Sequence, residues 1–147
     1  ENRKRIRKKK HPKKFDKKYS EAIIKKLPFE LTNSQKKVLA EINLDLMSDR
    51  RMFRIIQGDV GSGKTIVSLL AIINVIKSGY QCALMGPTEI LAKQHFELSK
   101  KILKNIGIKI DFLTGKTDYK DRKKILANLI NGKTNLLIGT HALFQKK

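Results

Sequence analysis

Residues 58–65 read Gly-Asp-Val-Gly-Ser-Gly-Lys-Thr, and this stretch decides the fold. It fits the pattern G-x-x-x-x-G-K-[ST], in which glycines let the backbone curl so that several N–H groups face one phosphate. The β-branched and aromatic run Phe53–Gln57 predicts a strand before the loop. The apolar run Thr65–Lys77 predicts a helix after it, with Gly79 as its stop. A loop of this kind that opens a helix predicts a nucleotide-binding site, because the helix N-terminus adds its positive dipole end.

The residue types in the loop suggest individual roles. Lys64 can reach the β- and γ-phosphates and the Thr65 hydroxyl can bind Mg²⁺, so these two are the candidate catalytic residues and ATP with Mg²⁺ the expected cofactors. The amide of Gln35 suits the N6/N7 edge of adenine, but Gln35 also completes a capping box with Thr32 at the start of a helix. The candidate nucleotide-binding residues are Gln35, Gly58, Asp59, Val60, Gly61, Ser62, Gly63, Lys64 and Thr65.

Strands and helices are expected to alternate along the rest of the chain. Apolar runs predict strands, and stretches with helical periodicity between them predict helices. Such alternation indicates an α/β fold with a parallel sheet and helices on both faces. The expected strands are Cys82–Met85, Ile108–Leu113 and Leu136–Ile138. The first two expected helices are residues 17–26 and a helix that Thr32 opens, with Val38, Leu39, Ile42 and Leu46 at helical spacing. The other two run from Thr88 to about Asn105, before Gly107, and from Asp118 to Asn131-Gly132.

Distinctive polar or glycine-containing turns follow the expected strands. They are Gly58-Asp59-Val60, Pro87-Thr88-Glu89, Thr114-Gly115 and Gly139-Thr140-His141. Since ligands of open parallel sheets lie at the carboxyl ends of the strands, these turns predict one functional edge.

Composition narrows the class of protein. The 147 residues include 33 Lys+Arg and 13 Asp+Glu, a net charge of +20, and a field of that sign attracts polyanions such as nucleic acid. Residues 1–26 alone have 13 basic and 3 acidic side chains, which indicates a basic arm or the end of a connecting helix. The single cysteine, Cys82, excludes a disulfide framework. No apolar run is long enough for a transmembrane helix and no signal peptide opens the chain, so we expect a cytoplasmic protein.

The motifs together resemble a known enzyme family. Gln35, the loop Gly58–Thr65, Pro87–His95, Leu113–Gly115 and Gly139–Leu143 follow the motif order of the first motor domain of superfamily-two helicases. The sequences of four stretches resemble those of bacterial RecG-type ATP-dependent DNA helicases. These stretches are LPFELTNSQ from Leu27, QGDVGSGKT from Gln57, ALMGPTEILAKQH from Ala83 and GTHALFQ from Gly139.

The resemblance implies a RecA-like fold and a motor that acts on branched DNA by fork reversal and branch migration, in recombination and repair. It implies that residues 27–147 form the N-terminal part of the first motor domain, incomplete at its C-terminal end. It also implies a DNA partner held mainly through its backbone, no membrane, and a protein that is monomeric at full length in the bacterial cytoplasm. The residues that it places on the DNA-facing side are Thr88, Gln94, Thr114, Gly115, Thr140 and His141.

The family also has an Asp-Glu pair on the next strand and a second motor domain, and neither occurs in this sequence. We therefore expect a fragment that is inactive by itself. A transcription-repair coupling type translocase is the nearest alternative, and a non-catalytic basic nucleic-acid-binding module is another. A small P-loop kinase or GTPase would predict an acceptor lid or an Asn-Lys-x-Asp motif, and the sequence has neither.

Overall fold

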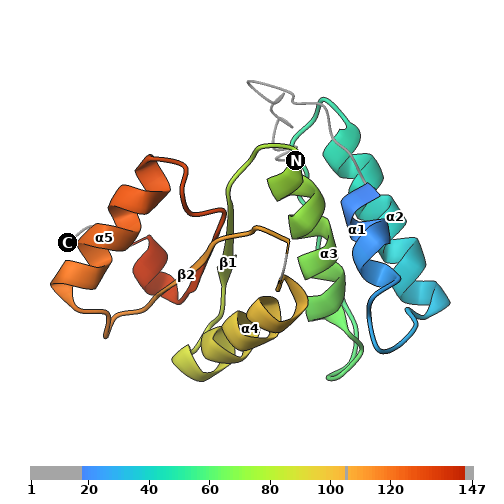
Figure 1. The fold of residues 1–147 in the computed structure, drawn as a ribbon. Coiled ribbons are helices and arrows are strands. Elements are labelled where there is room, and N and C mark those ends of the chain that lie inside the picture. The colour runs from blue at the N-terminus through green and yellow to red at the C-terminus, as the bar shows by residue number, and fades with distance from the viewer. Residues whose placement is uncertain (1–17, 105, 145–147) are drawn as a thin grey trace, which may run out of the picture. The chain divides into compact units, whose positions relative to one another are not determined.

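The computed structural model describes residues 18–104 and 106–144 (Figure 1). The chain forms two compact units, Glu1–Gly79 and Tyr80–Lys147, and each is described by itself. Residues 1–17 of the expected basic arm lie outside the described residues. The expected boundary between residues 26 and 27 therefore stays a prediction.

The first unit contains three helices: α1 (Lys18–Ile24), α2 (Asn33–Met47) and α3 (Lys64–Lys77). The first two both pack against α3. The predicted capping box opens α2, because the Thr32 side chain accepts from the Gln35 N–H and the Gln35 side chain accepts from the Thr32 N–H. The predicted stop of α3 is also confirmed: Gly79 has a φ of 86°, which favours glycine.

The strand predicted over Phe53–Gln57 is wrong. No strand is assigned between α2 and α3, and the side chains of Phe53 and Ile55 are 87% and 88% exposed. A strand exists only beside a partner that accepts its backbone hydrogen bonds. In the part of the chain that the structure describes, the only sheet is the one in the second unit, and this segment is not in it. The β-propensity of the run is therefore not matched by a partner.

A buried polar cluster joins the three helices of the first unit. Asn74 on α3 accepts from the Ser20 N–H at 2.9 Å and donates to the Ser20 hydroxyl at 2.8 Å and to the Asn43 side chain at 3.2 Å. All three residues are buried. This cluster fixes α1 and α2 on the helix that begins at the glycine-rich loop.

We expect Asn74→Ala to lower the free energy of unfolding by about 2 kcal/mol, because buried polar groups on Ser20 and Asn43 each lose a hydrogen-bond partner. Urea denaturation followed by circular dichroism measures the change. Asn128→Ala, at a half-buried position in α5, is the control. If the two variants unfold at the same urea concentration as the unmodified protein, the cluster does not stabilise the fold.

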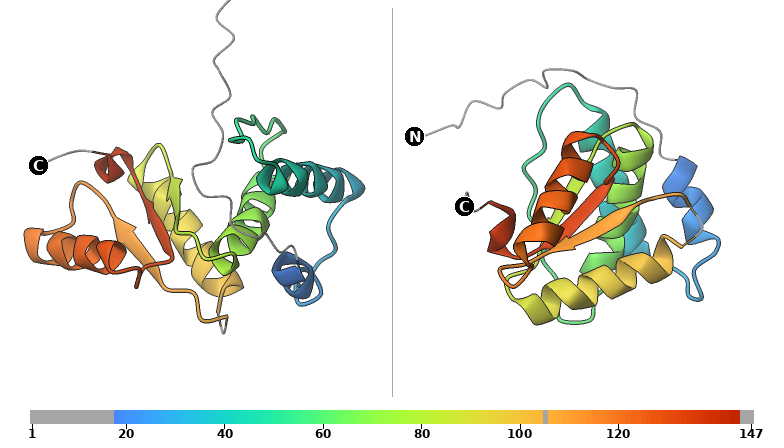
Figure 2. Two further views of the ribbon diagram at one scale, coloured as in Figure 1. Left: turned by 90° about the horizontal axis from the view of Figure 1, so that it is seen from above. Right: turned by 60° about the vertical axis from the view of Figure 1, so that its left-hand side comes forward.

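The second unit is a parallel sheet with the strand order β1-β3-β2, where β1 is Cys82–Met85, β2 is Ile110–Leu113 and β3 is Leu136–Gly139. Helix α4 (Glu89–Ile102) packs on β2 and β3, and α5 (Tyr119–Ile130) contacts β2. Figure 2 shows these two helices on opposite sides of the strands, as the sequence predicts. A short 3₁₀ helix, His141–Leu143, follows β3.

Neighbouring side chains of β2 have different partners. Phe112 packs against Phe96 of α4, with ring centres 5.1 Å apart and ring planes tilted by 36°. The neighbouring Asp111 accepts a hydrogen bond from the Thr134 hydroxyl.

Burial raises the pKa of the Cys82 thiol, on β1, to about 12, so this thiol is neutral at physiological pH. Among the described residues, no helix is long and apolar enough to cross a membrane.

Candidate nucleotide and nucleic-acid sites

The glycine-rich loop ends where α3 begins. Gly61 and Gly63 have φ values of 83° and 82°. A residue with a side chain would be strained in this conformation, so glycine is required at both positions. The Lys64 ammonium lies over the loop, where it donates to the carbonyl oxygens of Gly58 at 2.6 Å and Asp59 at 2.7 Å. A cationic side chain thus lies beside the start of a helix, which is an arrangement suited to a polyphosphate.

Gln35 lies against this loop. Its amide nitrogen donates to the Ser62 carbonyl at 2.9 Å, while its amide oxygen accepts from the Thr32 N–H at 2.9 Å. The structure therefore supports the capping role and adds a direct contact between α2 and the loop. The reading of adenine by Gln35 remains a prediction.

The loop fits ATP with a magnesium ion. Val60 is fully exposed and adding a Cβ at Gly61 meets no atom within 4 Å, so the loop is open to a ligand. The described residues contain no cluster of three His, Cys, Asp or Glu side chains that could hold a metal. Thr65 lies next to Lys64 at the start of α3, and its role as a ligand for Mg²⁺ remains a prediction.

In the second unit, the structure brings the predicted turns to one edge. The register pairs Met85 with Gly139 and Leu113 with Gly139, so all three strands end at the same level. The chain leaves this edge at Gly86, Thr114 and Thr140. The predicted common edge is thus confirmed for three of the four turns, all of which belong to this unit.

The candidate DNA-facing residues differ in their surroundings. Thr88 caps α4 by accepting from the Leu91 N–H at 3.3 Å, and buried Thr114 accepts from the Lys116 N–H at 3.2 Å. Gly115 and His141 are exposed, and Thr140 is half-buried. Gln94 is exposed on the second turn of α4. Which of these residues contact DNA remains a prediction.

An ion pair that the sequence analysis missed joins two of these turns. The Glu89 carboxylate, in the first turn of α4, lies 2.8 Å from the Lys116 ammonium, just after Gly115. The hydrogen bond from Lys116 is the main reason why the pKa of Glu89 is lowered, and the same bond raises the pKa of Lys116. The pair is therefore charged at neutral pH; it is lost in acid, when Glu89 is protonated below its usual pKa, and in base, when Lys116 loses its proton above its usual pKa. Its only signal in the sequence is that both residues follow the end of a predicted strand.

Comparison with known proteins gives the family. The profile of the DEAD/DEAH box helicase family matches residues 32–147. The chain is 46% identical over 143 residues to the ATP-dependent DNA helicase RecG of Aquifex aeolicus, which covers 97% of this chain and 18% of that protein. It is 49% identical over 123 residues to RecG of Bacillus subtilis, which covers 84% of this chain and 18% of that protein. The chain thus spans about a fifth of the length of these relatives.

Solved structures agree with this assignment. A structure of RecG bound to a three-way DNA junction superimposes with a TM-score of 0.86 at 45% identity, covering 92% of this chain and 19% of that one. A hypothetical ATP-dependent RNA helicase from Sulfolobus tokodaii has a TM-score of 0.61 at 19% identity over 84% of this chain and 33% of that one, which shows the shared fold alone. The profile match over most of the chain shows that it belongs to the DEAD/DEAH box helicase family.

Proposed function

We propose that this chain is part of the motor of an ATP-dependent DNA helicase that acts on branched DNA in recombination and repair. The observation that supports this most strongly is the loop Gly58–Thr65 at the start of α3 in a chain about half identical to RecG helicases. ATP supplies a phosphate bond whose hydrolysis drives movement. DNA is the proposed partner, the bacterial cytoplasm the proposed location, and a monomer the proposed state of the full-length protein.

The residues of the first unit have distinct proposed roles. The loop N–H groups and the α3 N-terminus bind phosphate oxygens. Lys64 exchanges the Gly58 and Asp59 carbonyls for phosphate oxygens, where its charge stabilises the transition state. Thr65 binds Mg²⁺, and Gln35 connects the loop to α2, where it also reads adenine.

The residues of the second unit are proposed to bind the DNA. Thr88, Gln94, Thr114, Gly115, Thr140 and His141 face the sugar-phosphate backbone. Contacts of this kind position a duplex without reading its sequence, as a motor that moves over any sequence requires.

The experiment measures phosphate release by the full-length protein without DNA, with linear duplex and with a three-way junction. We expect DNA to stimulate turnover and the junction to do so most. Equal stimulation by linear duplex and junction would favour the translocase alternative. Binding to DNA without any ATP hydrolysis would favour the non-catalytic module.

A further inference from the structure

Helix α5 presents a basic face to solvent. Its inner side chains, Ile125 and Leu129 among them, are only half-buried, and none of its residues is fully buried. Three lysines within five residues are exposed, and Tyr119 beside them is 78% exposed. Of the three, Lys124 also lines the hollow between α5 and β2, together with Asp111 and Asp121. We call the set Tyr119, Lys120, Lys123 and Lys124 the α5 basic face.

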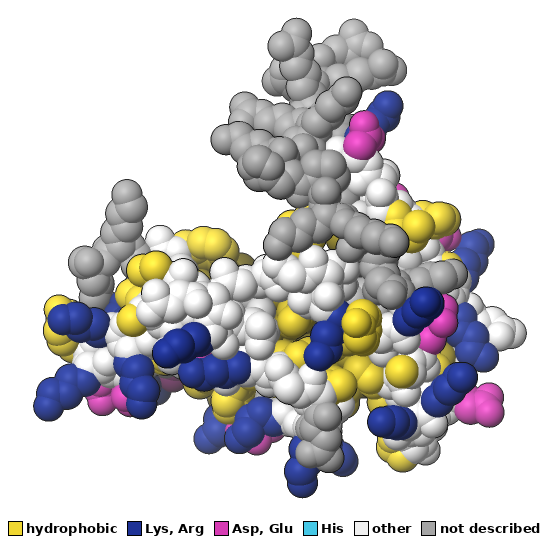
Figure 3. Space-filling model, turned by 45° about the horizontal axis from the view of Figure 1, so that its top comes forward, with side chains coloured by type: hydrophobic (Ala, Val, Ile, Leu, Met, Phe, Trp, Pro, Cys, Tyr) yellow, Lys and Arg dark blue, Asp and Glu magenta, His cyan; other side chains and the backbone are white. Residues whose placement is uncertain are grey.

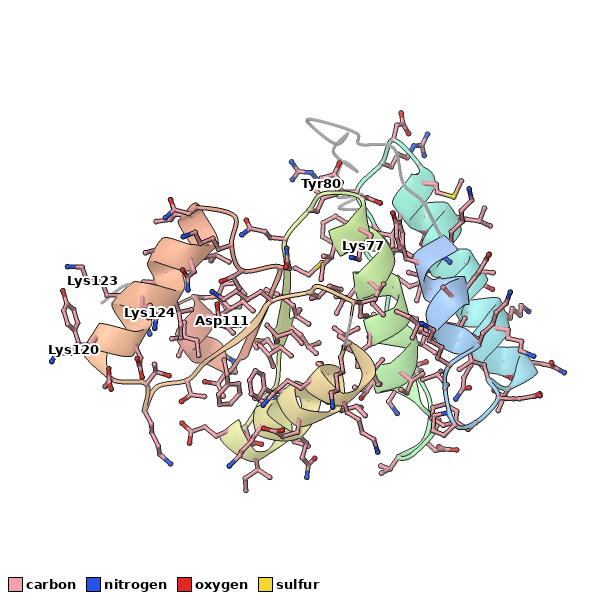
Figure 4. The ribbon with its side chains drawn as sticks, in the orientation of Figure 1. Lys77, Tyr80, Asp111, Lys120, Lys123 and Lys124 are labelled. Atoms are coloured by element: carbon pink, nitrogen blue, oxygen red, sulfur yellow. The ribbon has the colours of Figure 1, made fainter. Side chains whose placement is uncertain are left out.

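No described acidic side chain forms an ion pair with these three lysines; the ion pairs of this unit are Lys100–Glu97 and Lys116–Glu89. Lys120 lies one helical turn from both Lys123 and Lys124, and like charges at this spacing repel each other. Figure 4 shows Lys120 and Lys123 reaching away from the sheet, whereas Asp111 lies beside the strands. In Figure 3, Lys and Arg side chains gather on the side of the second unit where α5 lies. None of these three lysines is therefore held in an ion pair within the described chain, although Asp118 and Asp121 lie in the same turns of the helix.

The position of this face matters as much as its charge. Only Thr114–Asp118 separate the end of β2 from the first residue of α5. Helix α5 therefore begins at the edge where Thr88, Thr114 and Thr140 leave the strands. A polyanion lying along that edge would reach the first turns of α5 next.

We propose that the α5 basic face is a further contact for the nucleic-acid backbone, extending the surface that begins at the strand-end turns. Lysine ammonium groups neutralise phosphates and release counterions, and an exposed tyrosine offers a ring for stacking and a hydroxyl for a phosphate. The inference rests on the proposed function, because it takes DNA as the partner. An acidic protein as the partner is the competing outcome.

The test replaces the three lysines together, K120Q/K123Q/K124Q, in the full-length protein. Glutamine keeps helix propensity and removes charge. Fluorescence anisotropy with a labelled three-way junction is measured over a range of salt concentrations. We expect a loss of affinity of roughly tenfold or more at moderate salt, and a plot of log K against log salt shallower by about 2 to 3, since each phosphate contact contributes about 0.9 to that slope.

The matched control is K101Q/K104Q/K133Q. These lysines are exposed, lie in the same unit and change the net charge equally, but they lie near the amino ends of the strands. We expect this control to keep most of the affinity and slope. A variant with arginine at positions 120, 123 and 124 should bind as tightly as the unmodified protein, because it keeps the charge.

Three results would overturn the inference: unchanged affinity and slope in the α5 variant, equal losses in both glutamine variants, or an unchanged DNA slope together with lost binding to an acidic protein. Failure of the proposed function looks different, because the unmodified protein would then show no DNA-stimulated phosphate release. Circular dichroism of each variant shows whether the helix content is retained.

Discussion

Replacing Lys64 with alanine is expected to abolish ATP hydrolysis by the full-length protein. The Lys64 ammonium lies 2.6 Å and 2.7 Å from two loop carbonyls, at the start of α3. A charge-assisted hydrogen bond contributes roughly 1.5–3 kcal/mol to binding. Loss of one preorganised group that stabilises transition-state charge typically lowers turnover by about 100-fold to 1000-fold. We therefore expect phosphate release at saturating junction DNA to fall by at least about 100-fold.

The control for this variant is Lys37→Ala, on the exposed side of α2. It removes the same charge from the same unit, but away from the loop, and should leave turnover unchanged. Junction binding measured without nucleotide should be similar for both variants and the unmodified protein, because the proposed DNA contacts lie in the second unit. Normal turnover in Lys64→Ala would show that Gly58–Thr65 is not the site of hydrolysis.

The loop and its helix could be predicted from sequence because each residue there has a local physical requirement. Gly61 and Gly63 have positive φ angles, and Lys64 starts the helix that the apolar periodicity of the following residues predicts. The capping box at Thr32 is local for the same reason, since both of its hydrogen bonds join residues three positions apart. Local patterns of this kind are read correctly because no distant partner is needed.

Features that depend on a distant partner were predicted less well. Strand β2 was expected from Ile108 but begins at Ile110, because its partner β3 begins at Leu136, which is paired with Ile110. The segment Phe53–Gln57 has the composition of a strand but no neighbour in the described sheet. Strand bounds therefore follow the pairing, whereas propensity only indicates where pairing is possible.

Helix ends and side-chain pairs show the same limit. Helix α4 was expected to reach about Asn105, but it ends at Ile102 and Leu103 is its C-cap. The Glu89–Lys116 ion pair joins residues 27 positions apart and exists only because β1 and β2 end at one level. No periodicity in the sequence encodes that alignment.

The second large effect is expected at Gly139, the last residue of β3. It lies between the ends of β1 and β2, in register with Met85 on one side and Leu113 on the other. A Cβ added at Gly139 would overlap the carbonyl oxygen of Leu113. That oxygen is backbone and also accepts from the Thr140 N–H, so it cannot move aside without separating β3 from β2. We expect Gly139→Ala to lower the free energy of unfolding by about 3 kcal/mol or more, in the range of severe core overpacking.

Gly115→Ala is the matched control, because a Cβ there meets no atom within 4 Å and Gly115 has no positive φ. It lies at the same edge and should change the free energy of unfolding by less than about 0.5 kcal/mol. Urea denaturation of the full-length protein, followed by circular dichroism, compares the two variants. Cys82 offers a second readout, because the burial that raises its pKa to about 12 should make alkylation slow until the sheet opens. If Gly139→Ala matches Gly115→Ala in urea midpoint and in labelling rate, β3 and β2 do not approach as closely as the register requires, and the edge that aligns Thr88, Thr114 and Thr140 is not built as described.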